Sequence, residues 1–550
     1  MTDNFQSLSN EIANDFLQSV VFIDDKAYSL VDDADIPHDF DAQAITRGFA
    51  NNRKISSIFQ PESEEDIQLF SDIAAKADIT VLDWQIIIQQ DKEIDSEVVE
   101  EDGEEDADVD DIRGYYTKII ISKLLSSASN RNSLKLILVY TGDTDLTNIA
   151  TEILDHLNDN QINGFCISAD DDCSVVSKSC RILVRAKSNG GNGRGKHNPD
   201  LKNKEVSYQD LPDFINSEFS KMTNGLLSNF TLQALTVIRG NFFQILNVFS
   251  KKMDAAYLTH KSLLSNISDA NELLVELLGD TFTSILRAKN LNHNISQKIV
   301  EQWIEHYIED EQRPKLDNSG NPTNDMFNRS KELLKSLLVS SLNVEEKFIR
   351  ILQNSGFSKK AAKNNYKKYA FSLFHPQGED ETENRDFALL CQHKDLVKYD
   401  NYSPMLTLGT VIKSTLDLGS FYVCIQQRCD SLRIGEQENR RFLFLTLALV
   451  EENKKFDFLT PDGLKLKLDK STYDMRTIKF FGSTEGTVRA VNENGSVYFI
   501  PSYYSDSAPE KLEFIFELKE LYAQRIVEQY SSKLSRVGLD EPEWIRLQNN

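Results

Sequence analysis

The stretch that decides the fold reads SVVFIDDK and covers residues 19–26. Four apolar residues follow Ser19 and lead directly into Asp24 and Asp25. A short apolar run of this kind is typical of a strand that is buried on both faces of a sheet. The sequence therefore predicts a buried strand that carries two carboxylates to its C-terminal end.

The residues that follow alternate between strand-like and helix-like segments. Apolar and β-branched runs predict further strands at residues 54–59, 78–83, 134–141, 164–168 and 181–187. Helix-like segments cover residues 64–76, 115–127 and 145–157. Strands that alternate with helices need crossover connections, which favour a mostly parallel sheet. We therefore expect an α/β domain over residues 1–188.

Polar residues lie at or just after the ends of the predicted strands. They are Asp24, Asp25, Asp83, Thr141 and Lys187. The C-terminal ends of strands in a doubly wound sheet converge on one crevice. Phosphoryl transfer to a carboxylate needs a nucleophilic Asp, carboxylates that hold a divalent metal, a Lys that neutralises the phosphate and a hydroxyl that senses it. The five residues supply all four roles, although the pair Asp24–Asp25 alone is readily explained as the cap of a strand end.

Four segments carry a resemblance to a known family: FIDDK at 22–26, VLDWQ at 81–85, LVYTGD at 138–143 and LVRAK at 183–187. With them the chain resembles the response-regulator receiver domain, and more closely the divergent receiver-like domains of bacterial conflict and phage-defence proteins. The resemblance implies a five-stranded flavodoxin-like sheet. It also implies that Asp83 is the phosphoacceptor and that Asp24 and Asp25 join it in binding Mg²⁺. Thr141 is then the switch hydroxyl, and Lys187 is the phosphate-binding lysine.

The spacing of these segments departs from the usual receiver pattern. The residues after Asp83 lack the usual Pro-x-x-Asp-Gly turn, and an acidic insertion at 91–111 separates Asp83 from Thr141. If residues 164–168 formed the fifth strand, neither of the next two positions would be a lysine. Two interpretations therefore stay open: a working phosphoacceptor, or a degenerate receiver that serves as a docking or dimerisation module.

Composition divides the rest of the chain into further segments. Residues 189–204 are rich in Gly, Asn and Lys, which predicts a linker. Helical periodicity predicts an all-α helical domain at 205–374. Short strands separated by turn residues predict a β-rich, small barrel-like domain at 401–512. We expect an acidic linker at 375–400 and a helical tail at 513–550.

Two features stand out within the helical domain. Residues 227–249 have apolar residues at every third or fourth position, which predicts one long amphipathic helix. Arg239 interrupts this pattern beside Gly240, where the helix could bend or contact a partner. The Pro, Gly and Asn residues of 313–324 predict a loop.

A second possible site lies in the β-rich domain. Residues 421–433 read FYVCIQQRCDSLR, and strand alternation would place Gln426, Arg428 and Asp430 on one face. These polar side chains could bind a ligand or a partner chain. Alternatively, the arginine and the aspartate form an internal ion pair on a half-exposed sheet.

The net charge is strongly negative, and part of it is local. The chain of 550 residues carries a formal net charge of −25, and residues 91–111 hold thirteen Asp or Glu against one Lys. An acidic surface repels phosphate backbones and anionic lipid head groups, so nucleic acid and membranes are disfavoured as partners. The longest apolar run, at 442–450, is too short for a spanning helix, and residues 1–19 do not resemble a signal peptide. We therefore expect a cytoplasmic protein.

A weaker resemblance covers most of the chain. Segments 222–239, 406–413 and 426–433 are similar to large defence-associated receiver proteins, which tend to be encoded beside histidine-kinase-like (GHKL) ATPases. This resemblance implies a two-component-like phosphorelay or adaptor protein with such an ATPase as its protein partner. Motifs typical of hydrolases, such as His-Glu-x-x-His and Gly-x-Ser-x-Gly, are absent from the sequence, so an enzyme is less favoured. An effector enzyme centred on the β-rich domain, a nucleic-acid-binding regulator and a homo-oligomer are alternatives that stay open.

Overall fold

The computed structural model divides the chain into two compact units, which are described separately. They are Met1–Val248 with Asp280–Phe374, and Phe249–Gly279 with His375–Asn550. The structure describes residues 5–28, 40–88, 113–126, 133–188, 201, 203–264, 267, 269–375, 382–394, 402–417, 419–451, 455–468, 475–502 and 510–534. The predicted acidic insertion at 91–111 and most of the predicted linker at 189–204 lie outside the described residues.

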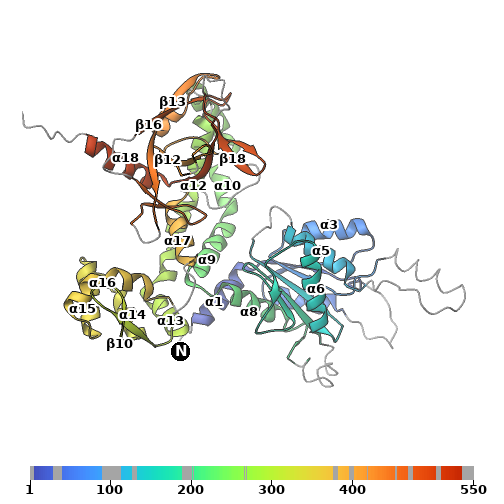
Figure 1. Ribbon diagram of the computed structural model, residues 1–550. Helices are drawn as coiled ribbons and strands as arrows, with labels where there is room; N and C mark the ends of the chain where they lie inside the picture. The colour runs from blue at the N-terminus through green and yellow to red at the C-terminus, as the bar shows by residue number, and fades with distance from the viewer. Residues whose placement is uncertain are drawn as a thin grey trace, which may run out of the picture. The chain divides into compact units, whose positions relative to one another are not determined.

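The first unit contains an eight-stranded sheet whose central strands are parallel (Figure 1). Five parallel strands stand in the order β2-β1-β3-β4-β7. Their bounds are β1 Ser19–Ile23, β2 Ile55–Phe59, β3 Ile79–Leu82, β4 Lys135–Thr141 and β7 Cys180–Lys187. This order, with helices in the crossovers, is that of a flavodoxin-like sheet and confirms the predicted α/β fold.

The fifth parallel strand is the one that ends in Lys187. Residues 164–168, predicted as a strand of the sheet, contribute only the short β5, Cys166–Ile167, which pairs antiparallel with β6, Ser174–Val176. Strand β6 pairs antiparallel with β7, so the hairpin extends the sheet at its edge. A further short strand, β8 (Glu205–Val206), pairs in parallel with the end of β7. The β5–β6 hairpin is therefore an insertion, and it accounts for the long spacing between β4 and β7.

Helices cover both faces of this sheet and bury an apolar core on each. One face packs against α3, α5 and α6, and the other packs against α1, α2, α8 and α9. Their bounds are α1 Phe5–Phe16, α2 Ala42–Asn51, α3 Glu64–Ala74, α5 Tyr115–Ser126, α6 Leu146–Asp159, α8 Leu211–Thr223 and α9 Leu226–Gly240. Helix α8 lies beyond the predicted boundary at residue 188, yet its Leu211, Ile215 and Phe219 belong to the core of the sheet. Helix α8, which follows the last strand of the sheet, is thus packed against the sheet.

The helix predicted at 227–249 is two helices. Helix α9 ends at Gly240, where the low helix propensity of glycine favours a break, and α10 follows at Phe242–Val248. Arg239 anchors α9 to the sheet, because its guanidinium group pairs with Asp78 at 2.7 Å and donates to the carbonyl oxygen of Phe16 at 3.0 Å. The helices that follow along the chain are α11 Asp254–Leu263, α12 Asp269–Ala288, α13 Gln297–Tyr307, α14 Lys331–Leu337, α15 Val344–Asn354 and α16 Lys359–Ser372.

The region predicted as all-α contains a β-hairpin, so that prediction was wrong in part. Residues 313–324, predicted as a loop, lie in strands β9 (Glu311–Leu316) and β10 (Pro322–Arg329) and in the turn between them. The ring of Phe327 on β10 packs edge-to-face against the ring of Phe357. A proline in each strand made the sequence look like a loop, because proline is usual only at strand edges and bulges. A two-stranded ribbon offers such edges on both sides.

The second unit contains a nine-stranded antiparallel sheet, which confirms the predicted β-rich region (Figure 1). Its strands are β11 Thr410–Ser414, β12 Phe421–Cys424, β13 Asn439–Leu449, β14 Phe458–Leu459, β15 Lys465–Leu468, β16 Met475–Phe481, β17 Val491–Glu493, β18 Ser496–Phe499 and β19 Leu512–Glu517. They stand in the order β14-β15-β13-β12-β11-β19-β18-β17, and β16 pairs with β13. Alternate side chains of the strands enter one core on each face. The pairing order of the described strands is an open path, and side chains of β12, β13, β16, β18 and β19 share one of the two cores. The small barrel stays a prediction.

The segments before and after the β-rich domain differ from the predicted linker and helical tail. Helix α17, Thr382–Gln392, lies within the stretch predicted as an acidic linker at 375–400. The tail predicted as helical from residue 513 begins in strand β19, which pairs with β11, and helix α18 follows at Glu520–Leu534. The six residues LEFIFE of β19 fit both a strand and the edge of a helix, so pattern alone does not separate the two.

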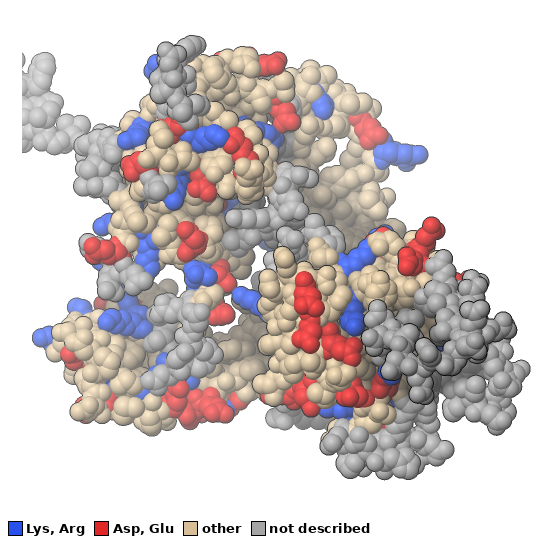
Figure 2. All heavy atoms as spheres, turned by 45° about the vertical axis from the view of Figure 1, so that its right-hand side comes forward, with Lys and Arg blue, Asp and Glu red and all other residues tan. Residues whose placement is uncertain are grey.

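Basic and acidic side chains are interspersed over the face of the molecule in Figure 2. In that view no broad basic surface offsets the net charge of −25 among the described residues. Within the part of the chain that the structure describes, no helix is long and apolar enough to cross a membrane.

Candidate functional site

The parallel pairing of the central strands brings the five predicted residues to one edge of the sheet. The register aligns the last residues of β1 and β3 with each other and with residues of β4 and β7. Residues that come at or just after the C-terminal ends of these strands therefore lie at the same edge of the sheet. They are Asp24 and Asp25 after β1, Asp83 after β3, Thr141 at the end of β4 and Lys187 at the end of β7. All five are buried.

The ammonium group of Lys187 lies between two carboxylates. Its Nζ is 2.8 Å from Oδ2 of Asp24 and 2.8 Å from Oδ1 of Asp83. The ammonium group therefore forms an ion pair with each acid, and it donates a hydrogen bond to Asp24. Lys187 is only 3% exposed. Its positive charge is therefore stabilised by the two carboxylates and hardly at all by water.

The backbone fixes the orientation of the two acids that flank Lys187. Oδ1 of Asp24 accepts a hydrogen bond from the N–H of Lys26 at 2.9 Å. Oδ2 of Asp83 accepts one from the N–H of Gln85 at 3.2 Å. The N–H of Asp83 donates to the carbonyl oxygen of Ile23 at 2.9 Å, which extends the pairing of β1 and β3 into the site. One oxygen of Asp83 is therefore held by the backbone, and the other faces the ammonium group.

Three carboxylates at this edge have the composition of a divalent-metal site. Asp24, Asp25 and Asp83 each offer an oxygen that lies within 4.8 Å of the others. Oδ1 of Asp25 is buried and has no hydrogen-bond partner within the described part of the chain. Carboxylate oxygens are the ligands that Mg²⁺ prefers, and a buried oxygen without a donor is a position that a cation could satisfy. The residues present therefore fit a magnesium ion.

Burial and mutual repulsion disfavour the ionised carboxyl groups. Burial, followed by the charge of Asp24, raises the pKa of Asp25 to about 6. Burial also raises the pKa of Asp83, against the opposing effect of Lys187. Burial alone would lower the pKa of Lys187, but Asp83 and Asp24 outweigh it and raise that pKa above its usual range. Three carboxylates and one ammonium group leave an excess of negative charge that a bound cation would balance.

The residue after Asp83 is packed against helix α5, a contact that the sequence analysis missed. The hydroxyl of Thr117 donates to the carbonyl oxygen of Asp83 at 2.6 Å, and the N–H of Gly114 donates to that of Trp84 at 3.1 Å. Gly114 has a φ of +76°, and a Cβ there would lie 2.2 Å from the indole ring of Trp84. Only glycine allows this approach. The start of α5 is thus tied to the backbone of the candidate phosphoacceptor.

Aromatic rings lie beneath Lys187 and connect it to the segment that leaves the sheet. The Nζ atom lies 5.5 Å from the ring centre of Phe40 and 6.0 Å from that of Tyr140. The hydroxyl of Tyr140 donates to the carbonyl oxygen of Val206 on β8 at 2.6 Å. The sequence showed Tyr140 only as one residue of a buried strand, although a tyrosine within an otherwise aliphatic run is a signal that its hydroxyl has a partner.

The three residues proposed as a site in the β-rich domain do not share a strand face. Strand β12 ends at Cys424, and Arg428–Ser431 form a short 3-10 helix, so the alternation that grouped Gln426, Arg428 and Asp430 does not extend to them. Arg428 lines a cavity, where its Nη1 lies 3.9 Å from Oε1 of Glu276. The sequence pattern failed because it assumed one strand through the whole segment.

Comparison with known proteins adds one match. Residues 16–192 match the family model described as the response receiver domain. The matched range contains all five residues at the edge of the sheet. No curated protein matches the chain, and no solved structure matches it.

Proposed function

Because residues 16–192 form a response receiver domain, we propose that the chain is a signalling protein in which Asp83 accepts a phosphoryl group. The position of Lys187, between the carboxylates of Asp24 and Asp83, is the observation that carries this proposal. A buried ion pair adds little net stability compared with apolar packing. The ammonium group is instead placed to neutralise the charge of a phosphoryl group on Asp83.

In the proposed reaction a carboxylate oxygen of Asp83 attacks the phosphorus atom of a phosphodonor. The new bond between Asp83 and phosphorus forms as the bond to the leaving group breaks, and the leaving group departs with the electron pair of that bond. Oδ1 is suited to the attack, because Oδ2 is occupied by the backbone N–H of Gln85. The product is an acyl phosphate on a buried strand end.

The neighbouring residues would stabilise the product. The ammonium group of Lys187 can exchange its contact with Asp83 for a contact with a phosphoryl oxygen, which restores its ion pair. Thr141 ends the strand next to β7 and would supply a hydroxyl that contacts the phosphoryl group. Asp24, Asp25 and Asp83 would hold a magnesium ion, which would neutralise negative charge on the phosphoryl oxygens.

The output of the site is proposed to pass through Tyr140 and β8. A shift of Lys187 toward a phosphoryl group would change its contact with the ring of Tyr140, whose hydroxyl holds Val206. The ring of Tyr208, two residues further on, packs edge-to-face against Tyr140 and lies just before α8. The contacts therefore form a short physical connection from the acceptor site to the helices that follow.

We further propose that a histidine-kinase-like ATPase is the partner that phosphorylates or docks on the receiver domain, in a bacterial phage-defence-type system. This part of the proposal rests on the sequence resemblance of segments 222–239, 406–413 and 426–433. The helical and β-rich parts would then act as an adaptor for partner proteins. The receiver domain is the part of this proposal that can be tested without the partner.

Acetyl phosphate and Mg²⁺ supply that test. We expect the intact mass of the full-length protein to rise by one phosphoryl group, and we expect Asp83→Ala to abolish the rise. Asp155→Ala changes an exposed acid on α6 and serves as the matched control, which should still be modified. If the wild-type protein gains no phosphoryl group, the domain is a degenerate receiver and the proposal is wrong.

A further inference from the structure

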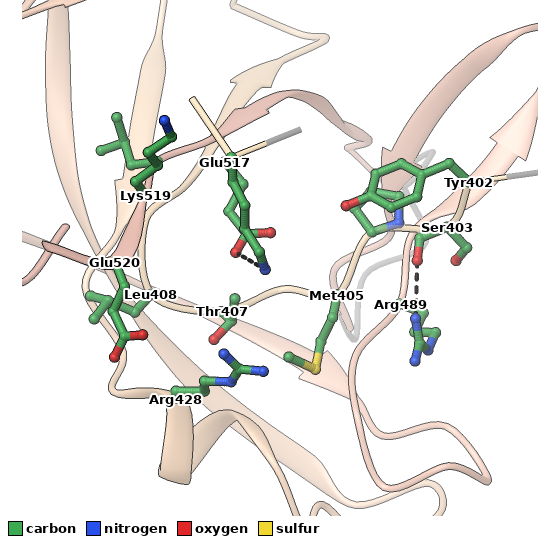
Figure 3. Close-up of a pocket in the computed structure, with 13 residues that line it drawn as sticks. Tyr402, Ser403, Met405, Thr407, Leu408, Arg428, Arg489, Glu517, Lys519 and Glu520 are labelled. Carbon is green, nitrogen blue, oxygen red and sulfur yellow. Dashed lines mark hydrogen bonds and ion pairs between the residues drawn. The ribbon is translucent and has the colours of Figure 1, made fainter. Parts of the chain in front are cut away.

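A cavity of about 310 Å³ lies in the second unit, at one end of the antiparallel sheet (Figure 3). Its walls come from segments that are distant in the sequence: the turn before β11, the 3-10 helix after β12, and the end of β19. Segments 406–413 and 426–433, which the sequence analysis singled out, therefore meet here. The volume is at the lower end of the range for small-molecule sites in proteins, about 300 to 1,000 Å³.

A sharp turn holds Thr407 in the wall of this cavity. Gly409 has a φ of +89°, and a Cβ there would lie 2.9 Å from Cβ of Ala523. The N–H of Leu518 donates to the carbonyl oxygen of Gly409 at 3.0 Å, and the N–H of Thr407 donates to Oγ1 of Thr410 at 3.0 Å. The turn is thus fixed from both sides, and it needs glycine at its tightest point.

The hydroxyl of Thr407 is the polar group that this arrangement leaves unexplained. Thr407 is 4% exposed, and its Oγ1 has no hydrogen-bond partner among the described residues. Figure 3 shows the hydroxyl on the side of the cavity where the guanidinium group of Arg428 lies. Because a buried polar group without a partner is costly, it marks a position where a ligand atom could complete the hydrogen bonding.

Cations outnumber acids in the lining of the cavity. The basic residues are Lys394, Arg428, Arg489 and Lys519, and the acidic residues are Glu517 and Glu520. Two of the four cations are already paired: Nζ of Lys394 lies 3.0 Å from Oε1 of Glu517, and Nε of Arg489 lies 2.7 Å from Oε2 of Glu485. Arg428 lies 3.9 Å from Glu276, whose side chain is exposed. The two remaining cations of the lining, Arg428 and Lys519, outnumber Glu520, which favours an anionic ligand.

The remaining wall is apolar. Met405 and Leu408 lie on the turn that carries Thr407, and Tyr402 also lines the cavity (Figure 3). A ligand that fills the cavity would therefore bring an apolar or aromatic body along with its anionic group. In small-molecule sites a few polar groups fix the orientation of the ligand, while apolar walls supply most of the contact area.

We propose that this cavity binds a small organic anion, with a carboxylate or phosphate group held by Arg428 and the Thr407 hydroxyl and with an apolar or aromatic body against Met405 and Leu408. The guanidinium group binds either anionic group through paired N–H donors. The proposal is independent of phosphoryl transfer at Asp83, since every residue in it belongs to the second unit.

Calorimetric titration of the full-length protein tests the proposal, with adenosine monophosphate and benzoate as the probes. We expect at least one of them to bind, and we expect adenosine, which lacks the anionic group, to bind at least about tenfold more weakly than adenosine monophosphate. Arg428→Gln should weaken binding of the anionic probe by about tenfold or more, because it removes the charge and the paired donors. Thr407→Val, which keeps the shape of the side chain, should weaken it by several-fold.

Arg440→Gln is the matched control, because the side chain of Arg440 is 35% exposed and that of Arg428 is 36% exposed. It should leave binding unchanged. Thermal unfolding checks that each variant is folded. If Arg428→Gln does not fold, the binding measured with Thr407→Val tests the proposal. The proposal is wrong if neither probe binds at millimolar concentration, or if binding is insensitive to both substitutions. Binding of a peptide with a free C-terminal carboxylate, without binding of either small probe, would overturn the small-molecule assignment.

Discussion

The Nζ atom of Lys187 lies 2.8 Å from Oδ1 of Asp83. From the sequence, this lysine was the least secure member of the site, because residues 164–168 competed for the place of the fifth strand. In the structure the fifth parallel strand is β7, which ends in Lys187, and residues 166–167 belong to a hairpin at the edge of the sheet. The proposed chemistry of the site depends on this contact.

Replacing the lysine should destabilise the protein strongly. In Lys187→Met the three buried carboxylates lose their counter-ion, and loss of one partner of a buried ion pair costs about 3 to 5 kcal/mol. Urea unfolding at neutral pH measures the loss. Lys123→Met, which removes an ion pair with the exposed Asp72, should cost less than about 1 kcal/mol. Equal losses in the two variants would mean that Lys187 is not the counter-ion of the site.

Neutralising Asp83 should rescue that variant. Asp83→Asn removes one of the charges that Lys187 compensates, so the double variant Lys187→Met/Asp83→Asn should be more stable than Lys187→Met alone. A double-mutant cycle from urea unfolding measures the coupling between the two residues, which we expect to be on the order of 1 to 3 kcal/mol. Simple addition of the two single effects would contradict the ion pair.

Asp25 should make the protein more stable as the pH falls from 7 toward 4. Its pKa is raised to about 6 in the folded protein, above the ordinary value of 3.8. Between these values the folded state binds more protons than the unfolded state, so the free energy of unfolding rises as the pH falls. The contribution is at most about 3 kcal/mol, because one pKa unit corresponds to about 1.4 kcal/mol and the group is partly solvated. Asp25→Asn should reduce this rise, to which Asp83 also contributes because burial raises its pKa, and should stabilise the protein at pH 7. Unfolding curves at several pH values would show both effects.

Magnesium should bind at the edge of the sheet and not at the other acidic cluster. Mg²⁺ should raise the melting temperature of the wild-type protein, and this rise should be lost in Asp25→Asn. The second group of potential ligands contains Asp171 and Asp172, but Asp171 is already paired with Arg185 at 2.5 Å. Asp172→Asn should therefore leave the magnesium effect unchanged. If the magnesium effect were lost in Asp172→Asn and kept in Asp25→Asn, the ion would bind at Asp171 and Asp172, which would contradict the prediction.

Removing one hydroxyl should separate phosphoryl transfer from its output. Tyr140→Phe loses the hydrogen bond to the carbonyl oxygen of Val206, which costs about 1 kcal/mol, and it leaves Asp83 and Lys187 in place. We expect the variant to accept a phosphoryl group as the wild type does. Hydrogen exchange across α8 should change on phosphorylation in the wild type and should change much less in Tyr140→Phe. Equal changes in both proteins would exclude Tyr140 as the connection.

The fold of the N-terminal domain and the grouping of its polar residues could be predicted, because both follow from one rule. Parallel strands place their C-terminal ends at one edge, so residues 140 or more positions apart can be grouped once the strands are found. Lys187 was harder, because an edge hairpin of very short strands lies between α6 and β7. Pattern analysis cannot tell such strands from the main ones.

Contacts that depend on packing between distant segments could not be predicted. The hydrogen bond from Thr117 to Asp83 and the fit of Gly114 against Trp84 arise only when α5 docks on the sheet. The hairpin of β9 and β10 was missed because its prolines and turn residues resemble those of a loop. The strand alternation that grouped Gln426, Arg428 and Asp430 was wrong, because the strand ends at Cys424.

The position of the phosphoryl group decides whether Asp83 is the acceptor. The protein is incubated with Mg²⁺ and acetyl phosphate, the acyl phosphate is reduced with borohydride, and peptide mass spectrometry identifies the reduced aspartate. We predict that Asp83 is reduced to homoserine and that the modification disappears when acetyl phosphate is omitted. An unmodified Asp83, or reduction of another aspartate in its place, would contradict the account.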